Sequence, residues 1–258
     1  MARGPDRSLR LEDVSLSFGG VQAIRDLSFE APAGAICGLI GPNGAGKTSV
    51  LNVISGFYRP QRGRVRYGDL DLLRLPPHRV IHHNIARSFQ NVALFKELSV
   101  LDNLLLGADH DSRAGLLQNT LRLPSARRHE RAAHERAERV LAFLDIGRLR
   151  QRRAGDLSFG DQKLVDVGRA LVGDPTLLLL DEPAAGLQDT QKVWLTEVIR
   201  RIPREYGATV LLIDHDMGLV LGVSSHVVVV EFGTKIGEGA PAEIRANPRV
   251  VAAYLGPE

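Results

Sequence analysis

The sequence predicts an α/β fold built on a parallel central sheet, and three observations carry this prediction. Residues 35–40, 177–180 and 208–213 are short, almost wholly apolar runs, as expected of strands buried on both faces of a sheet. Acidic residues follow the second and third runs, at the end of the strand where open α/β sheets bind ligands. A glycine-rich loop at 41–48 follows the first run and leads into an expected helix at 47–54.

The composition is that of an ordinary globular protein. Of 258 residues, 44% are hydrophobic and 24% charged, and the length suffices for one α/β domain with a large core. The 33 basic and 30 acidic residues leave a formal net charge of +3, which does not indicate a nucleic-acid partner. The single cysteine, Cys37, excludes a disulfide framework, favours a reducing cytosol and is expected to be a core residue.

Two further observations concern membranes. No apolar run approaches the roughly 18–20 residues that a membrane helix needs. Residues 1–7 lack the apolar segment of a signal peptide. If the protein works at a membrane, we therefore expect a partner to hold it there.

The loop at 41–48 fits the phosphate-binding pattern G-x-x-x-x-G-K-[ST]. Its glycines let consecutive N–H groups approach an anion, and the following helix points its positive dipole end at the same phosphates. Lys47 can reach the β- and γ-phosphates, and the Thr48 hydroxyl can ligate Mg²⁺. The flanking strand and helix argue against an incidental glycine-rich turn. The candidate nucleotide contacts are Gly41, Pro42, Asn43, Gly44, Ala45, Gly46, Lys47, Thr48 and Ser49.

Strands are also expected upstream and downstream of this loop, at Leu9–Phe18, 23–30, 63–67 and 85–89, and residues 74–83 are expected to be irregular. Phe18 ends the first strand and could stack on a nucleotide base, although core packing is the simpler interpretation of one aromatic residue. Gln90 ends the fourth strand and could ligate Mg²⁺ or hold water, although an isolated glutamine usually does neither.

Helices are expected at 99–106, with Ser99 as its cap, and at 126–144. The region 122–153 is rich in arginine, but glutamates are interleaved at helical spacing. We interpret it as a solvated helix face and expect no nucleic-acid partner.

Residues 157–161 open another expected helix, which runs to Val172. Ser158 with Asp161 three residues later has the spacing of a capping box. The same helix start could also offer a hydroxyl and N–H groups to a phosphate, and the two interpretations are compatible.

The run at 177–180 ends in Asp181 and Glu182, two carboxylates at the edge where a nucleotide would lie. Asp181 would help to hold Mg²⁺, and Glu182 would orient or deprotonate the attacking water. The run at 208–213 leads to His215, which could contact the γ-phosphate. A hairpin at 227–238, a short helix from Pro241 and a last helix at 249–255 complete the expected elements.

These stretches, in this order and spacing, resemble the nucleotide-binding subunit of ATP-binding cassette (ABC) transporters over roughly residues 9–256. Residues 41–48 match the Walker A motif, Gln90 the Q-loop glutamine, 157–161 the Leu-Ser-Gly-Gly-Gln signature and 177–181 Walker B. The resemblance implies that Glu182 is the catalytic glutamate, that His215 is the switch histidine, that Phe18 stacks on adenine, and that Ser158 and Gly160 contact ATP. It implies Lys47 and Gln90 as further catalytic residues, and Thr48, Gln90 and Asp181 as Mg²⁺ ligands.

Finer features resemble the ATPases of branched-chain amino-acid importers, among them residues 18–21, 87–91, 181–187 and 253–256. Urea and short-amide importers and lipopolysaccharide exporters share several of these features, so those solutes stay open. Asp161, where the signature has glutamine, could repel a nearby phosphate, or could turn back and cap its own helix. Phe159 and Gln188 also depart from the usual signature and D-loop residues.

The resemblance implies a P-loop NTPase core with a parallel central sheet, an antiparallel β subdomain and a helical subdomain that carries the signature. We expect a single domain at 9–256, with the helical subdomain inserted at about 91–172, and a tail at 1–8. The implied cofactors are ATP and Mg²⁺. The implied partners are membrane permease subunits, a second ATPase subunit (the same chain or a related one) and, indirectly, a periplasmic solute-binding protein, at the cytoplasmic face of the membrane.

Two alternatives come from other classes. A soluble ABC-type ATPase of DNA repair or translation is disfavoured, since the chain has one P-loop and no long heptad run. A P-loop kinase is disfavoured by the signature stretch together with Glu182 and His215, which favour water as the acceptor.

Overall fold

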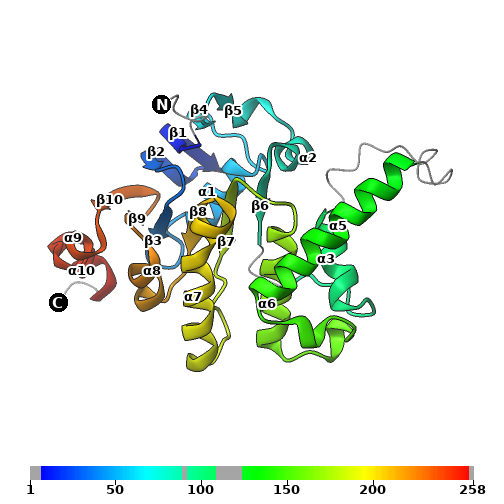
Figure 1. The fold of residues 1–258 in the computed structure, drawn as a ribbon. Coiled ribbons are helices and arrows are strands. Elements are labelled where there is room, and N and C mark those ends of the chain that lie inside the picture. Colours follow the sequence, from blue (N-terminus) through cyan, green and yellow to red (C-terminus); the bar gives the residue numbers. More distant parts are fainter. Residues whose placement is uncertain (1–6, 89–91, 109–123, 256–258) are drawn as a thin grey trace, which may run out of the picture.

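The computed structural model describes residues 7–88, 92–108 and 124–255, and it contains two sheets with helices around them (Figure 1). The larger sheet has six strands, in the spatial order β10, β9, β3, β8, β7, β6. β9 and β10 are antiparallel, and the other neighbours pair in parallel. The strand bounds are β3 Ile36–Ile40, β6 Ile85–Arg87, β7 Leu177–Asp181, β8 Thr209–Ile213, β9 His226–Glu231 and β10 Thr234–Gly239.

The smaller sheet is antiparallel and has the order β2, β1, β4, β5. Its strands are β1 Leu9–Phe18, β2 Val21–Ala31, β4 Arg62–Tyr67 and β5 Leu70–Asp71. The predicted α/β class, with a parallel central sheet and an antiparallel β part, is confirmed.

Two groups of helices lie on opposite sides of the molecule in Figure 1. α3 (Val100–Ala108), α5 (Pro124–Phe143) and α6 (Phe159–Leu171) lie together on one side of the molecule, and α9 (Pro241–Ala246) and α10 (Pro248–Leu255) lie on the opposite side. The others are α1 (Lys47–Ile54), α2 (Pro77–Val80), α7 (Asp189–Tyr206) and α8 (Met217–Val223). None of the helices in the described part of the chain combines the length and apolar character that crossing a membrane requires.

Successive side chains of a strand point to opposite faces of the sheet, and apolar clusters cover both faces of the central strands. In β7, Leu177 and Leu179 pack into one apolar cluster with α1 and the antiparallel sheet, whereas Leu178 and Leu180 pack into a second cluster with α6 and α7. This two-sided burial explains the uninterrupted run of leucines and fixes the carboxyl end of the strand at one edge of the core.

Two sequence-based expectations need correction. Residues 74–83, expected to be irregular, include α2 and a 3-10 turn at Ile81–His83; Pro77 is the first residue of α2, where its fixed φ favours a helix start. The sequence analysis also missed α7, although its buried residues follow helical spacing: Leu195, Val198, Ile199 and Ile202. By contrast, Ser99 accepts a hydrogen bond from the backbone N–H of Asp102, as its predicted capping role requires.

Candidate functional site

Glycines shape the loop between β3 and α1. Gly44 and Gly46 have φ angles of 79° and 99°, in the left-handed region that favours glycine. A Cβ on Gly46 would lie 2.3 Å from the carbonyl oxygen of Ala23, whereas one on Gly44 would meet nothing within 4 Å. The loop is therefore held against β2 on one side and open on the other, where an anion can approach its N–H groups.

Lys47, the first residue of α1, folds back over this loop. Its Nζ donates hydrogen bonds to the carbonyl oxygens of Gly41, at 2.7 Å, and Pro42, at 2.9 Å. The residue is only 7% exposed, and burial lowers the pKa of its ammonium group, while the nearby charges of Glu182 and Asp181 oppose that shift. The Lys47 ammonium group and the two carboxylates at the end of β7 thus attract one another electrostatically, across the place where phosphates would lie.

The start of α1 offers two hydroxyl groups. Gly46 occupies the N-cap position and contributes no side chain there, so the helix start stays open to an anion. Thr48 is exposed and Ser49 is half-buried. The Thr48 hydroxyl and the Asp181 carboxylate are both oxygen donors, the type that a hard cation such as Mg²⁺ prefers, so this pair fits the predicted ion.

The acidic end of β7 lies beside the end of β8. Asp181 is directly opposite Ile213 in the parallel register, and the backbone N–H of Glu182 donates to the carbonyl oxygen of Ile213 at 2.7 Å. Two residues further on, the Nδ1 atom of His215 lies 3.8 Å from Glu182 Oε2 and 3.5 Å from Asp214 Oδ1. The fold therefore brings three separate parts of the sequence, Lys47, the Asp181–Glu182 pair and His215, to one edge of the sheet.

Arg87 is a member of this cluster that the sequence analysis did not assign to the site. It ends β6 and donates from Nη2 to Asp181 Oδ2 at 2.9 Å, and from Nη1 to Asn52 Oδ1 at 2.8 Å. Asp181 is buried, at 3% exposed, and the Arg87 side chain is 9% exposed. The sequence analysis placed Arg87 inside an expected strand at 85–89 and predicted no strand order, so no signal in the sequence pointed to this contact.

The sequence analysis also missed Lys163. It lies on α6, is buried, and donates from Nζ to the backbone carbonyl oxygen of Glu182 at 3.3 Å. Burial lowers the pKa of Lys163, and the charges of Asp166 and Asp214 are the largest influences that oppose this shift. The lysine thereby links α6 to the acidic end of β7.

Phe18 lies at the end of β1 and is 45% exposed. Its ring meets the ring of Tyr58 edge to face, with the centroids 4.9 Å apart. An exposed aromatic ring supported by a neighbour provides a face on which a base can stack.

Ser158 and Gly160 lie elsewhere, at the start of α6. They line a hollow of about 400 Å³ together with residues of α7, among them Gln191 and Trp194. Ser158 Oγ accepts from the backbone N–H of Asp161 at 3.2 Å and donates to Asp161 Oδ2 at 2.8 Å, so the aspartate does turn back onto its own helix. Gln90 lies outside the described residues. The predicted roles of all these site residues stay predictions.

Comparison with protein families gives two matches. Residues 24–185 match the family described as ABC transporter. Residues 234–256 match the family described as branched-chain amino acid ATP-binding cassette transporter.

Individual relatives extend the match along the chain. The high-affinity branched-chain amino acid transport ATP-binding protein LivG of Salmonella typhimurium is 39% identical, and the alignment covers 96% of this chain and 97% of that protein. BraF of Pseudomonas aeruginosa, which carries the same description, is 38% identical over the same shares. A probable LivG of Archaeoglobus fulgidus is 34% identical over 96% of this chain and 95% of that protein.

Solved structures agree. The crystal structure of the ADP conformation of MJ1267, an ATP-binding cassette of an ABC transporter, superposes with a TM-score of 0.82 at 32% identity, covering 96% of this chain and 98% of that one. A phosphate-binding loop, an acidic strand end and near-complete alignment with such cassettes lead to one conclusion. The chain belongs to the ABC transporter family, as an ATP-binding subunit that hydrolyses ATP.

Proposed function

We propose that this ATPase drives the import of branched-chain amino acids through a membrane permease. The observation that carries the proposal is the match to branched-chain relatives over 96% of the chain, together with the separate match at residues 234–256. That second segment forms β10, α9 and α10, and it includes no residue of the phosphate-binding loop or of the acidic strand end. Its match therefore supports the subfamily independently of the ATP-binding motifs.

In this proposal the P-loop and the end of β7 hold ATP. The N–H groups of the loop and the Lys47 ammonium bind the β- and γ-phosphates. Thr48 and Asp181, with Gln90, are the residues that would hold Mg²⁺, and Phe18 stacks on adenine. The ion, when bound, neutralises charge on the transferring phosphoryl group.

Glu182 and His215 serve the hydrolytic step. The Glu182 carboxylate accepts a proton from, or orients, the attacking water, and His215 steadies the γ-phosphate. The 3.8 Å separation between His215 Nδ1 and Glu182 Oε2 supports their acting on one phosphate and its attacking water.

Two ATPase subunits close head to tail in this mechanism, so that Ser158 and Gly160 of one subunit face the P-loop of the other. The second subunit is the same chain or a related one. The hydroxyl of Ser158 and the N–H groups that start α6 suit a phosphate, because a helix start carries positive partial charge.

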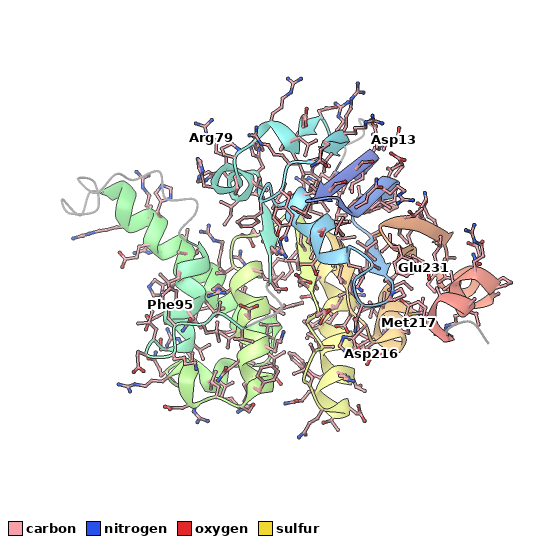
Figure 2. All side chains as sticks on the ribbon, turned by 180° about the vertical axis from the view of Figure 1, so that it is seen from behind. Asp13, Arg79, Phe95, Asp216, Met217 and Glu231 are labelled. Atoms are coloured by element: carbon pink, nitrogen blue, oxygen red, sulfur yellow. The ribbon has the colours of Figure 1, made fainter. Side chains whose placement is uncertain are left out.

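The permease would dock on a groove of about 300 Å³ that runs between the 3-10 turn Ile81–His83 and β6 on one side and α3 and α6 on the other. Three exposed apolar side chains line it, Ile81, Phe95 and Leu106. Figure 2 shows Phe95 beside the helical group, away from Asp216 and Met217 at the start of α8. Arg169 of α6 donates to the carbonyl oxygen of Ala93, so movement of that helix would reach the loop that carries Phe95.

Through this groove the ATPase would sit at the cytoplasmic face of the membrane, and a periplasmic solute-binding protein would deliver the solute to the permease. This arrangement requires no membrane-spanning helix of the ATPase itself.

Two measurements test the proposal. Tagged Glu182→Gln protein, pulled down in ATP from detergent-solubilised membranes, should recover polytopic permease subunits, and Phe95→Asp in the same background should lose them. Cells that lack the gene should lose energy-dependent uptake of labelled leucine and keep that of urea and acetamide. Recovery of only soluble proteins or nucleic acid would contradict the transporter assignment, and loss of urea uptake instead would redirect the solute.

A further inference from the structure

We propose that Arg148 is a positioning residue of the signature segment, which lets this chain use aspartate at position 161 instead of the usual glutamine. The inference rests on the proposed function, because it concerns the face that meets ATP bound to the other subunit. It starts from a chemical conflict. A carboxylate in the first turn of α6 lies where the phosphates of that ATP would approach, and like charges repel.

The structure contains an answer to this conflict. One carboxylate oxygen of Asp161 accepts the Ser158 hydroxyl proton at 2.8 Å, and the other lies 3.5 Å from Arg148 Nη2. Arg148 comes from the turn between α5 and α6, at Gly147–Leu149, and not from α6 itself. The three side chains therefore form a chain, Arg148 to Asp161 to Ser158, in which the arginine balances the added negative charge.

This chain also affects the hydroxyl group itself. Ser158 Oγ accepts from the backbone N–H of Asp161 while it donates to the Asp161 carboxylate. To donate to a phosphate, the hydroxyl must turn its proton away from Asp161. A carboxylate already held by Arg148 loses less when that hydrogen bond is given up, because the guanidinium continues to neutralise it.

The Arg148 side chain is 69% exposed, so the pair is screened by salt in the free subunit. An exposed pair of this kind changes an equilibrium about threefold. A dimer with two such sites should therefore be about tenfold weaker when Arg148 is lost. The ATP affinity of the monomer should not change, because Ser158 of the same chain does not belong to its own nucleotide site.

The experiment measures ATP-dependent dimerisation by analytical ultracentrifugation in the Glu182→Gln background, with ATP affinity of the monomer measured separately. The variants are Arg148→Gln, Arg148→Lys, Asp161→Gln and the double variant Arg148→Gln/Asp161→Gln. Arg153→Gln is the matched control, since it removes the same charge from a similarly exposed pair, with Glu97, in the neighbouring turn.

We expect Arg148→Gln to weaken the dimer about tenfold at low salt and less at high salt, and Arg148→Lys and Arg153→Gln to behave like the parent. In the Asp161→Gln background, Arg148→Gln should have no effect, because no carboxylate remains to be balanced. The inference would be overturned if Arg148→Gln weakened the dimer equally with Asp161 and in the Asp161→Gln background. It would also be overturned if Arg148→Gln did not weaken the dimer of the chain that retains Asp161, or if it changed the ATP affinity of the monomer. Failure of the parent to dimerise in ATP would instead overturn the proposed two-subunit function, and this inference with it.

Discussion

Two regions of the molecule differ in how exposed their charges are. The first is the nucleotide loop with the strand ends beside it, and the second is the signature segment. Lys47, at the start of α1, and Asp181, at the end of β7, are buried, and the side chain of Arg87, which pairs with Asp181, is only 9% exposed. Asp161 and Arg148 lie on a helix start and a turn, where solvent reaches the arginine. Both regions are proposed to meet the same type of ligand.

This difference in exposure predicts how strongly the protein responds when a charged side chain is removed by substitution. Buried charges interact strongly, and removal of one partner leaves the other uncompensated, so changes there should be severe. Exposed charges are screened by water and salt, so changes in the signature segment should be graded and salt-dependent.

The largest expected effect is on the hydrolytic carboxylate. Glu182→Gln should lower the steady-state rate of ATP hydrolysis at least about 100-fold with ATP binding retained, because an amide cannot accept the proton of the attacking water. Phosphate release and equilibrium binding measure the two quantities. Glu231→Gln is the matched control, since Glu231 also ends a strand of the same sheet and should keep its turnover. Undiminished hydrolysis in Glu182→Gln would contradict the role given to Glu182.

The next effect concerns the buried ion pair. Arg87→Met should lower the free energy of unfolding by about 3–5 kcal/mol, because Asp181 would keep a buried charge without its guanidinium partner. Urea denaturation measures this quantity.

Two comparisons make that prediction sharper. Arg87→Met/Asp181→Asn should recover part of the loss, since neither charge remains. Arg153→Gln, which breaks an exposed pair, should cost less than about 1 kcal/mol. If Arg87→Met were as mild as Arg153→Gln, the contrast between buried and exposed charges in this protein would fail.

Phe18 should give an intermediate effect, because its ring is partly exposed and contributes no charge. Phe18→Ala should weaken ATP binding about tenfold, the loss expected from one base-stacking contact, and Phe18→Tyr should restore it. Titration of the isolated subunit with a fluorescent ATP analogue checks both. Phe95→Ala removes a comparably exposed ring from the proposed permease groove and should leave ATP binding unchanged. Equal loss in both variants would argue against stacking at Phe18.

The smallest effect on the free energy of unfolding at neutral pH concerns Cys37. Its thiol is a probe of whether water reaches the core next to the P-loop. Burial raises the pKa of Cys37 to about 12, from an ordinary value of 9.0, with the charge of Glu238 as a smaller cause. The folded protein therefore holds the thiol proton after the unfolded chain has lost it, so this contribution to stability is complete below pH 9 and falls as pH rises from 9 towards 12. The slope is at most about 1.4 kcal/mol per pH unit.

Unfolding measured at pH 8 and pH 10 in the wild type and in Cys37→Ala isolates this contribution, because the variant lacks the titrating thiol. A maleimide should not label native Cys37 at pH 8. Rapid labelling of the native protein would show that water reaches this strand. The nucleotide loop and its neighbouring strands would then differ less in burial from the signature segment.

Much of the fold followed from local patterns. The apolar runs that became β3, β7 and β8, the first strand Leu9–Phe18 and the helix Lys47–Ile54 were predicted nearly to the residue. Local patterns were weaker where a short segment has no strong period, as at α2, and α7 was missed although its spacing was present. The sequence analysis did not name Arg87, Lys163 or Arg148 as site residues, and these three reach their partners from other elements of the fold.

The sequence by itself determined the P-loop, the acidic end of β7 and the likeness to an ABC ATPase, because each depends on residues adjacent in the chain. Only the tertiary structure decided which charges meet. Arg87 and Asp181 are 94 residues apart, and Arg148 reaches Asp161 from a separate turn. Such pairs depend on strand register and on how helices pack, which many distant contacts set together. The balance of charge at the site is therefore a property of the folded chain.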